Sequence, residues 1–263
     1  MPEWLKEGKV ALITGGSSGI GFALARALLQ RNMDVILLAR RRQLLNKAKE
    51  ELNEGERVTV ISADVSSVDS LMNAAKLITK SHSSIDLLVN CAGIVKPSLL
   101  KDLSFEEINN HIQINLIGVI NVVKIFQEYI PRGGAILNVS SGIVFFGIAG
   151  YTAYNASKTG IMGFFDPLRR ELLSRGITVH VVCPWDVDTP QYRKEQEEMP
   201  EWMKGSIRPK PMNVDIAVKR IIKGLIRNRY LIRPNFMTKF SSFMQRHLPP
   251  VWRFIIDKAV PKP

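Results

Sequence analysis

The stretch Lys9-Val10-Ala11-Leu12-Ile13-Thr14-Gly15-Gly16-Ser17-Ser18-Gly19-Ile20-Gly21 decides the fold of this chain. Its first six residues are a short apolar run typical of a buried strand, and its glycines predict a tight turn. Residues 22–29 follow as good helix formers with apolar side chains at helical spacing. A strand, a glycine turn and a helix together present backbone N–H groups at a helix N-terminus, which favours anions such as a pyrophosphate.

The same alternation of strand-like and helical runs continues along the chain. Further strand-like runs lie near 34–39, 57–62, 86–89, 134–140 and 177–182, with a short one at 230–232. This order predicts an α/β fold: one doubly wound, Rossmann-like parallel sheet with helices on both faces. At 263 residues the chain fits a single domain, 1–263, with a sizeable core and a C-terminal helical extension.

Tyr154 and Lys158 form the most informative pair of side chains. Four residues apart on a predicted helix, they rise from the same face. A neighbouring ammonium favours the phenolate, so we expect Lys158 to lower the pKa of Tyr154 and make it a general acid. The alternative is an accidental pair on a solvated helix face, and other elements of the sequence decide between the two.

The end of the second strand indicates which nucleotide is bound. Val35-Ile36-Leu37-Leu38-Ala39 runs into Arg40-Arg41-Arg42, with no carboxylate between Val35 and Lys49. An acidic residue at this place binds a ribose 2′-hydroxyl, whereas an arginine accommodates a 2′-phosphate. We therefore expect Arg40 and Arg41 to select NADPH. The alternative, a solvated basic helix start, is electrostatically unfavourable because cations destabilise a helix N-terminus.

Several motifs in the same order resemble the short-chain dehydrogenase/reductase family over about residues 9 to 190. The glycine spacing G-x-x-x-G-x-G differs from the more common G-x-G-x-x-G but resembles this family's cofactor turn. Ser141 precedes Tyr154 by thirteen residues, which is the family's usual separation. Pro184-Trp185 stands where the family usually has Pro-Gly. The remaining resembling elements are Asp64-Val65, Asn90-Cys91-Ala92-Gly93, Asn115 and Thr189.

The resemblance implies a role for each of these residues. Tyr154 would donate the proton, Lys158 would hold the ribose, Ser141 would donate to the substrate carbonyl, and Asn115 would position Lys158 through water. Ser141 alternatively caps a turn, and Asn115 alternatively bonds a backbone carbonyl. No metal is expected. The cofactor contacts implied are Gly15, Ser17, Ser18, Gly19, Ile20, Gly21, Arg40, Arg41, Asp64, Val65, Asn90, Ala92, Gly93, Tyr154, Lys158, Pro184, Val187 and Thr189.

Composition indicates where the protein works. Two cysteines, Cys91 and Cys183, are too few for a disulfide framework and fit a reducing compartment. The sequence shows no secretory signal pattern and no run of about 20 apolar residues. We expect a cytoplasmic protein, at most peripheral on a membrane surface.

Positive charge is concentrated near the C-terminus. From Arg208 to Pro263 there are 13 Lys and Arg against two acids, so this stretch carries nearly all of the chain's net charge of +12. Phe240, Phe243, Met244 and Leu248 predict an apolar helix stripe within a basic amphipathic segment, 235–263. Such segments bind anionic membranes. The alternative is packing on the substrate pocket or on another subunit; nucleic-acid binding is disfavoured because no recognised motif accompanies the charge.

The region after Thr189 bears on the substrate. In the family, the segment that corresponds to 190–211 covers the substrate. Here Pro184-Trp185-Asp186-Val187-Asp188-Thr189-Pro190, followed by an acidic stretch, resembles 3-ketodihydrosphingosine reductases. This narrower resemblance implies an NADPH-dependent reductase of a long-chain 3-keto lipid.

Other functions stay open at this point. One is a 3-oxoacyl-thioester reductase acting on a carrier protein or coenzyme A, or a reductase of another hydrophobic ketone such as a steroid. A non-catalytic NADPH-binding sensor or scaffold is a remote alternative. The resemblance also implies a homo-dimer or homo-tetramer built through the helix around 106–130 and the helix that carries Tyr154.

Overall fold

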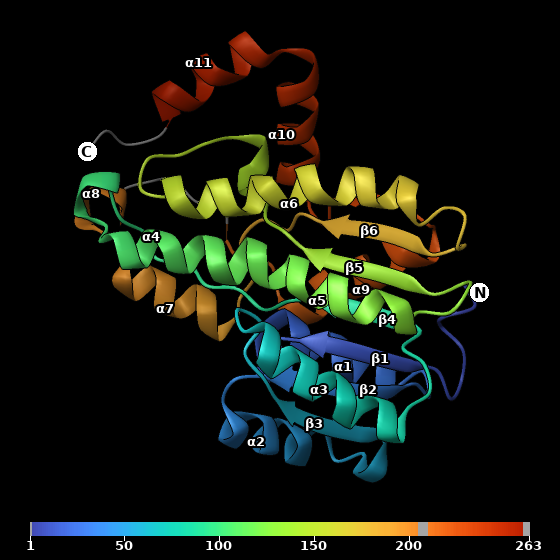
Figure 1. Ribbon diagram of the computed structural model, residues 1–263. Coiled ribbons are helices and arrows are strands. Elements are labelled where there is room, and N and C mark those ends of the chain that lie inside the picture. Colours follow the sequence, from blue (N-terminus) through green and yellow to red (C-terminus); the bar gives the residue numbers. More distant parts are fainter. Residues whose placement is uncertain (1, 205–209, 260–263) are drawn as a thin grey trace.

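The computed structural model describes residues 2–204 and 210–259. Within them, seven parallel strands form one sheet in the order β3-β2-β1-β4-β5-β6-β7 (Figure 1). The predicted strand positions agree with the structure to within one residue at each end. The strands are β1 (Val10–Thr14), β2 (Asp34–Ala39), β3 (Val58–Ser62), β4 (Leu87–Asn90), β5 (Ala135–Val139), β6 (Thr178–Val182) and β7 (Leu231–Ile232).

Helices cover both faces of this sheet, as predicted. One face packs against α3, α5 and α6, and the other packs against α1, α2 and α9. The helices are α1 (Gly19–Leu29), α2 (Arg42–Leu52), α3 (Val68–Ser81), α4 (Phe105–Ile112), α5 (Gly118–Phe126), α6 (Thr152–Glu171), α7 (Pro190–Glu198), α8 (Glu201–Lys204), α9 (Val214–Ile226), α10 (Phe236–His247) and α11 (Pro249–Ala259).

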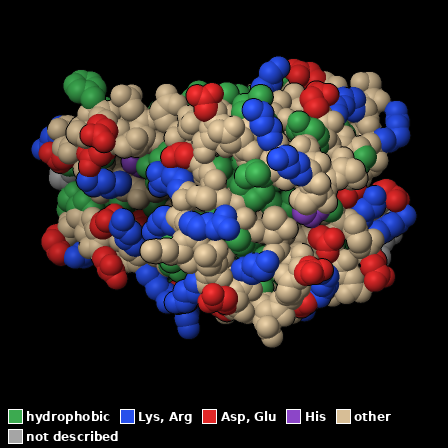
Figure 2. All heavy atoms as spheres, turned by 60° about the horizontal axis from the view of Figure 1, so that its bottom comes forward, with side chains coloured by type: hydrophobic (Ala, Val, Ile, Leu, Met, Phe, Trp, Pro, Cys, Tyr) green, Lys and Arg blue, Asp and Glu red, His purple; other side chains and the backbone are tan. Residues whose placement is uncertain are grey.

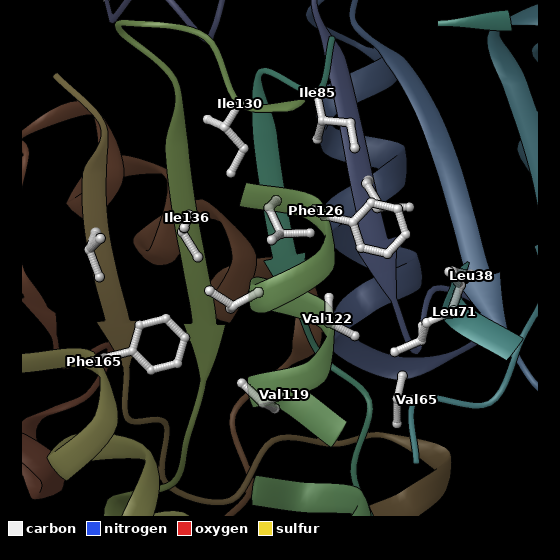
Figure 3. Packing of buried hydrophobic residues seen from close by; sticks show 14 of the residues in the cluster. Leu38, Val65, Leu71, Ile85, Val119, Val122, Phe126, Ile130, Ile136 and Phe165 are labelled. Carbon is white, nitrogen blue, oxygen red and sulfur yellow. The ribbon is translucent and has the colours of Figure 1, made fainter. Parts of the chain in front are cut away.

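The core on the first face explains why the sheet is rigid. Phe126 of α5 and Phe165 of α6 are fully buried, and they pack with Leu71 of α3 over strand residues such as Ile136 (Figure 3). Burying a side chain of this size stabilises the fold by roughly 1.5–3 kcal/mol relative to leaving it exposed. The strand ends that carry the functional residues are therefore held on a packed framework.

The strand order places a crevice at one edge of the sheet. β1 lies between β2 and β4, so the chain turns in opposite directions after β1 and after β4. Ligands of open α/β sheets bind outside the carboxyl ends of the strands at such a switch point. The glycine turn after β1 and the segments after β4, β5 and β6 all meet there.

The C-terminal extension is helical, as expected, and it lies outside the layers formed by the sheet and its covering helices. In Figure 1, α10 rises from the body and α11 turns back from its far end. The predicted apolar stripe is wrong in one respect. Met244 faces inward with Thr238 and Ser241, whereas Phe240, Phe243 and Leu248 are exposed. The expectations for 190–211 and 235–263 extend over 205–209 and 260–263, which lie outside the described residues.

Candidate active site

The glycine turn leaves no room for side chains. Gly15 has a φ of +65°, and a Cβ on it would lie 2.8 Å from the backbone nitrogen of Ala92. A Cβ on Gly21 would lie 2.5 Å from the carbonyl oxygen of Gly15. Real Cβ atoms do not approach other heavy atoms this closely, so the turn and the start of α1 require glycine here.

The N-terminus of α1 is prepared for an anion. Ser18 is the N-cap residue, but its side chain makes no capping hydrogen bond, and the first turn carries no acidic residue. No side chain at the start of α1 therefore caps the backbone N–H groups of this turn. They face a large cavity together with Ser17, Gly19 and Ile20.

That cavity has a volume of about 1040 Å³ and joins three parts of the molecule. Its first part is the glycine turn with the end of β2, and its middle holds the predicted catalytic residues. Its third part is lined by the C-terminal helices. The predicted residues on its wall are Gly15, Ser17, Ser18, Gly19, Ile20, Gly21, Arg40, Arg41, Val65, Ala92, Gly93, Ser141, Tyr154, Lys158, Pro184, Val187 and Thr189.

Arginines stand at the nucleotide end of the cavity. Arg40 and Arg41 both line it, and Arg40 lies 3.9 Å from Asp64 while staying largely exposed. Arg42 instead donates to the carbonyl oxygen of Val60. Asp64 does not reach the cavity wall, because its carboxylate accepts hydrogen bonds from the backbone and hydroxyl of Ser66.

The segment after β4 is tied to the glycine turn by one hydroxyl. Thr14 accepts hydrogen bonds from the backbone N–H groups of Cys91 and Ala92, each at 3.2 Å. Thr14 is therefore a positioning residue that the sequence showed only as the end of a strand. Asn90 is fully buried beneath this segment and does not line the cavity, so the structure does not place its side chain at the cofactor.

Ser141, Tyr154 and Lys158 meet in the middle of the cavity. The Ser141 hydroxyl accepts a hydrogen bond from the backbone N–H of Ile143 at 3.3 Å, as its alternative capping role predicted, and it also lowers the pKa of Tyr154. The Lys158 nitrogen lies 5.8 Å from the centre of the Tyr154 ring. Lys158 donates to the carbonyl oxygen of Val139 at 3.1 Å, which aims its ammonium along the cavity floor. Neighbouring Ser140 instead donates to the Lys158 backbone carbonyl, which leaves Ser141 as the serine that faces Tyr154.

Burial dominates the protonation of this group. It raises the pKa of the Tyr154 phenol, the Glu195 carboxylate raises it further, and the hydrogen bond with Ser141 opposes the rise. Burial also lowers the pKa of Lys158 from 10.5 to about 8. Lys158 is not among the groups that shift the pKa of Tyr154, and burial raises that pKa more than any other cause. The expectation that Lys158 holds the pKa of Tyr154 below its ordinary value is therefore wrong for the protein by itself, because the burial of the phenol dominates.

Asn115 lies at an irregular turn between α4 and α5. The turn Gln113–Ile117 is π-helical, a form that is frequently found at functional sites. The Asn115 side chain accepts from the backbone of Ile94 at 2.8 Å and donates to its carbonyl and to Ser157. It thus holds backbone, as the alternative role predicted, and its oxygen also lies near Lys158. A Cβ on Gly93 would be 3.2 Å from that oxygen and 3.3 Å from the Lys158 nitrogen.

Comparison with known proteins agrees with this geometry. A model of the short chain dehydrogenase family matches residues 9–200. The chain belongs to this family. It is 37% identical over 185 residues to the 3-oxoacyl-[acyl-carrier-protein] reductase FabG of Vibrio harveyi, covering 70% of this chain and 75% of the relative. It is 34% identical over 183 residues to carbonyl reductase family member 4 of Xenopus tropicalis, covering 69% and 76%.

Solved structures show the same fold. A short chain dehydrogenase from Burkholderia cenocepacia, crystallised in complex with NADP, superimposes with a TM-score of 0.81 and 23% identity, covering 95% of this chain and 98% of that one. A short chain dehydrogenase/reductase from Burkholderia phymatum, crystallised with NAD, gives a TM-score of 0.83 and 20% identity, covering 96% and 97%. The two sequence relatives are a FabG and a carbonyl reductase, so the narrower resemblance to 3-ketodihydrosphingosine reductases stays a proposal.

This member of the short chain dehydrogenase family departs from the usual pattern at Trp185. Its indole stacks on Phe146 with ring centres 4.7 Å apart, and Pro184 accepts a hydrogen bond from Gly142 at 2.7 Å. The residue that replaces the usual glycine therefore becomes an aromatic wall of the cavity. Thr189 follows as the N-cap of α7, and its side chain packs against Gly19 of the cofactor turn.

The described part of segment 190–211 includes two helices, α7 and α8, and residues that follow α7 and form α8 pack on the cluster that contains Tyr154. Met199 and Met203 are buried against Ile143 and Tyr151, and Trp202 packs on the same cluster. Glu195 of α7 accepts a hydrogen bond from the Tyr151 hydroxyl at 2.5 Å. The segment therefore contributes both apolar surface and a carboxylate to the substrate side of the cavity.

The third wall comes from the C-terminal helices. Trp252 of α11 is buried and donates its indole N–H to the carbonyl oxygen of Phe145 at 2.9 Å. Its ring packs edge-on against Phe146 and Phe240, 6.4 and 5.7 Å between centres. Phe240 lines the cavity, as the alternative interpretation of its apolar stripe predicted. The sequence did not identify Trp252 or Phe146 as site residues, because no sequence spacing connects positions about 100 residues apart. The other wall residues of α10 and α11 are Met237, Ile255, Ile256 and Ala259.

Among the described residues, no group of three or more His, Cys, Asp or Glu side chains could hold a metal ion. Within the same ranges, no helix has the length and apolar character required to cross a bilayer.

Proposed function

We propose that this protein is an NADPH-dependent reductase that converts a ketone on a long apolar chain to a secondary alcohol. One observation carries the proposal: the Ser141–Tyr154–Lys158 group lies in a single cavity between an anion-binding glycine turn and an apolar aromatic wall. The glycine turn suits a dinucleotide, and the aromatic wall suits a hydrophobic substrate.

The residues at the nucleotide end fit a phosphorylated dinucleotide. The glycine turn excludes side chains where a pyrophosphate needs close backbone approach, and the α1 N-terminus supplies N–H groups. Arg40 and Arg41 supply the positive charge that a 2′-phosphate requires. When bound, the nicotinamide supplies the hydride.

The chain's own residues handle the proton and the developing charge. Ser141 and Tyr154 present two hydroxyl groups to one point of the cavity, where a carbonyl oxygen gains both a hydrogen bond and a proton. Lys158 provides the positive charge that stabilises the phenolate left behind. Because burial holds the pKa of Lys158 near 8, a fixed negative group nearby would be needed to keep it fully charged.

Two substrate classes remain, and different observations favour them. The relative from Vibrio harveyi, a 3-oxoacyl-[acyl-carrier-protein] reductase, favours a 3-oxoacyl thioester. The aromatic wall of α10 and α11 lies beyond residues 9–200, which the family model matches, and it favours a substrate with a long free chain such as a 3-keto lipid. Both reductions use the same proton donor and differ only in what the far end of the cavity must accept.

We also propose a homo-oligomer built through α4, α5 and α6. Phe105, at the start of α4, is the most exposed of the large hydrophobic side chains in the described residues, at 87%. The family resemblance supports these helices as the subunit contact, and Phe105 provides an exposed position at which to test it. Phe105→Glu is expected to lower the molar mass in solution.

A side-by-side NADPH oxidation assay tests the proposed function. Purified protein is given a 3-oxoacyl thioester and a long-chain 3-keto lipid amine, each with NADPH and with NADH. We expect turnover with NADPH on at least one substrate, and Arg40→Asp should raise the KM for NADPH far more than the KM for NADH. Absence of turnover on both substrates, with NADPH still bound, would contradict a reductase and favour a sensor.

A further inference from the structure

We propose that the outer face of α10 and α11 docks on an anionic lipid surface, so that the substrate cavity opens toward the bilayer. The inference concerns where the protein works and does not depend on which ketone it reduces. It rests on three observations: an exposed apolar face, basic residues on its border, and continuity of that face with the cavity wall.

The exposed face of α10 is aromatic. Phe236, Phe240 and Phe243 follow one another at helical spacing, and Phe236 stacks on Phe240 with ring centres 6.1 Å apart. Phe236 and Phe243 are 74% and 54% exposed, although the opposite side of the helix buries Thr238 and Ser241. The inner side of α10 thus carries two small polar residues with Met244, while its large aromatic residues lie outside, which is unusual for a surface helix.

The helix α11 continues this surface. Some of its apolar side chains line the cavity, and others are exposed beside it. Trp252, Ile256 and Ala259 face the cavity, whereas Val251 and Phe254 are exposed, the latter at 64%. Ile255 lies between the two groups and contributes to both the cavity lining and the exposed surface. An apolar ligand leaving this surface would therefore meet apolar side chains along the whole path into the cavity.

The charge on α10 and α11 indicates which kind of partner binds their exposed apolar face. The two helices carry Lys239, Arg246, Arg253 and Lys258 against one acid, Asp257, and all five are exposed. Among the described residues, the ion pairs include none of these side chains. On the face that Figure 2 brings forward, by contrast, acidic and basic side chains are interspersed.

Basic side chains beside an aromatic stripe are the pattern of helices that lie in a membrane interface. Lys239 and Arg246 lie one to three residues from the exposed phenylalanines of α10, where their ammonium and guanidinium groups would meet lipid phosphates. A second copy of the same face would bring like charges together, which disfavours self-association through it. We therefore commit to an anionic lipid surface as the occupant.

Vesicle sedimentation tests this proposal with the full chain and without substrate. The wild type is mixed with vesicles of phosphatidylcholine containing phosphatidylglycerol and with vesicles of phosphatidylcholine alone. Binding should be strong on the anionic vesicles and fall when salt is raised. Phe236→Ser, Phe243→Ser and Phe254→Ser, combined, should weaken it by well over tenfold, because each phenylalanine contributes about tenfold on full burial.

Matched variants distinguish binding through this surface from non-specific binding of the protein to vesicles. The combination Met72→Ser, Leu77→Ser and Leu173→Ser removes three exposed apolar side chains elsewhere and should leave vesicle binding unchanged. Lys239→Glu with Arg246→Glu should weaken binding to anionic vesicles only, while Lys76→Glu with Lys80→Glu should not.

Each outcome decides for or against the proposal. Loss of binding in the C-terminal variants alone supports it, and NADPH binding retained in those variants shows that they are folded. Equal loss in both sets of variants, or no wild-type binding, overturns it. A change in molar mass of the phenylalanine variant without any change in vesicle binding would assign the face to a second copy instead. Reductase activity enters none of these outcomes, so failure of the proposed function would be seen separately.

Discussion

The two ends of the cavity are built by different means. The nucleotide end is made of backbone: a strand, a turn in which Gly15 and Gly21 cannot carry a Cβ, and the N-terminus of α1. The substrate end is made of large side chains, Trp185, Trp252 and Phe240 among them, that come from segments far apart in the chain. Backbone geometry leaves little freedom for substitution, whereas an aromatic wall changes with each residue. One end therefore suits a constant cofactor and the other a variable substrate.

The largest effect is expected where the two ends meet. Tyr154→Phe removes the hydroxyl that we propose as the proton donor while keeping the ring packed between Tyr151 and His111. We expect kcat to fall by about 10²–10⁴-fold, which is the usual contribution of a general acid. Steady-state kinetics measures the loss, and NADPH binding by calorimetry should stay unchanged. Tyr129→Phe, at a tyrosine that does not line the cavity, is the control; an equal loss there would remove the special role of Tyr154.

The burial of Lys158 should lower the free energy of unfolding by an amount that depends on pH. Its folded-state pKa of about 8 lies below its ordinary value of 10.5, so the unfolded chain holds the proton more tightly. The cost is therefore fully present below pH 8 and disappears as the pH rises toward 10.5. Lys158→Met should raise the free energy of unfolding at pH 7 by up to about 3 kcal/mol, less the lost hydrogen bond to Val139.

Urea unfolding at pH 7 and pH 10 checks this prediction. The difference between variant and wild type should shrink at the higher pH, and catalysis should be lost at both. Lys219→Met, on an exposed surface, provides the matched control and should show neither effect. A constant difference between the two pH values would mean that the ammonium of Lys158 is not destabilised by burial.

A methyl group tests the backbone-built end. Gly21→Ala places a Cβ 2.5 Å from the carbonyl oxygen of Gly15, so the turn must shift. We expect a loss of roughly 1–3 kcal/mol in stability and about tenfold weaker NADPH binding. Gly163→Ala is the matched control, because a Cβ there meets nothing within 4 Å and lies on α6. It should stabilise the protein by roughly 0.5–1 kcal/mol, as a helical alanine does relative to glycine. Similar behaviour of both variants would contradict the close approach.

The smallest effect is expected at the side-chain-built end. Trp252→Phe keeps an aromatic ring but removes the hydrogen bond to the carbonyl of Phe145. That bond contributes about 0.5–1.5 kcal/mol, so the KM for a long-chain ketone should rise by about three- to tenfold. The KM for a short-chain ketone and the affinity for NADPH should not change. A rise in the KM for both ketones would mean that Trp252 supports the catalytic group and not the substrate chain.

The same contrast explains what the sequence predicted. The strands, the glycine turn and the Ser141–Tyr154 spacing follow from local patterns, because the residues that form them are close in sequence or lie at the ends of neighbouring parallel strands. The structure places most of the predicted cofactor residues on one cavity, while Asp64 and Asn90 lie behind it. The hydrophobic periodicity around Asp64 and Asn90 does not show in which direction their side chains point.

Local sequence patterns could not predict the substrate end of the cavity. The contact of Trp252 with Phe145 joins positions 107 residues apart, and it depends on how α10 leaves the body. The pKa directions also depend on tertiary burial: the pair Tyr154 and Lys158 was identified from its spacing, but the spacing alone predicted the opposite direction for Tyr154. Helical periodicity likewise predicted an apolar stripe on α10 without showing that Met244 would turn away from it.

The strand order has a consequence for how the chain assembles during synthesis. β1, β2 and β3 come from the first 62 residues and can pair as soon as they emerge. The other edge of β1 then waits for β4, whose residues 87–90 are made later, and during that interval it is an open edge that can pair wrongly. From β4 to β7 the sheet grows outward one strand at a time, and the last strand made, β7, becomes one of its two edges. We therefore expect refolding to be slow, and residues 10–14 to be protected from hydrogen exchange on their β2 side before their β4 side.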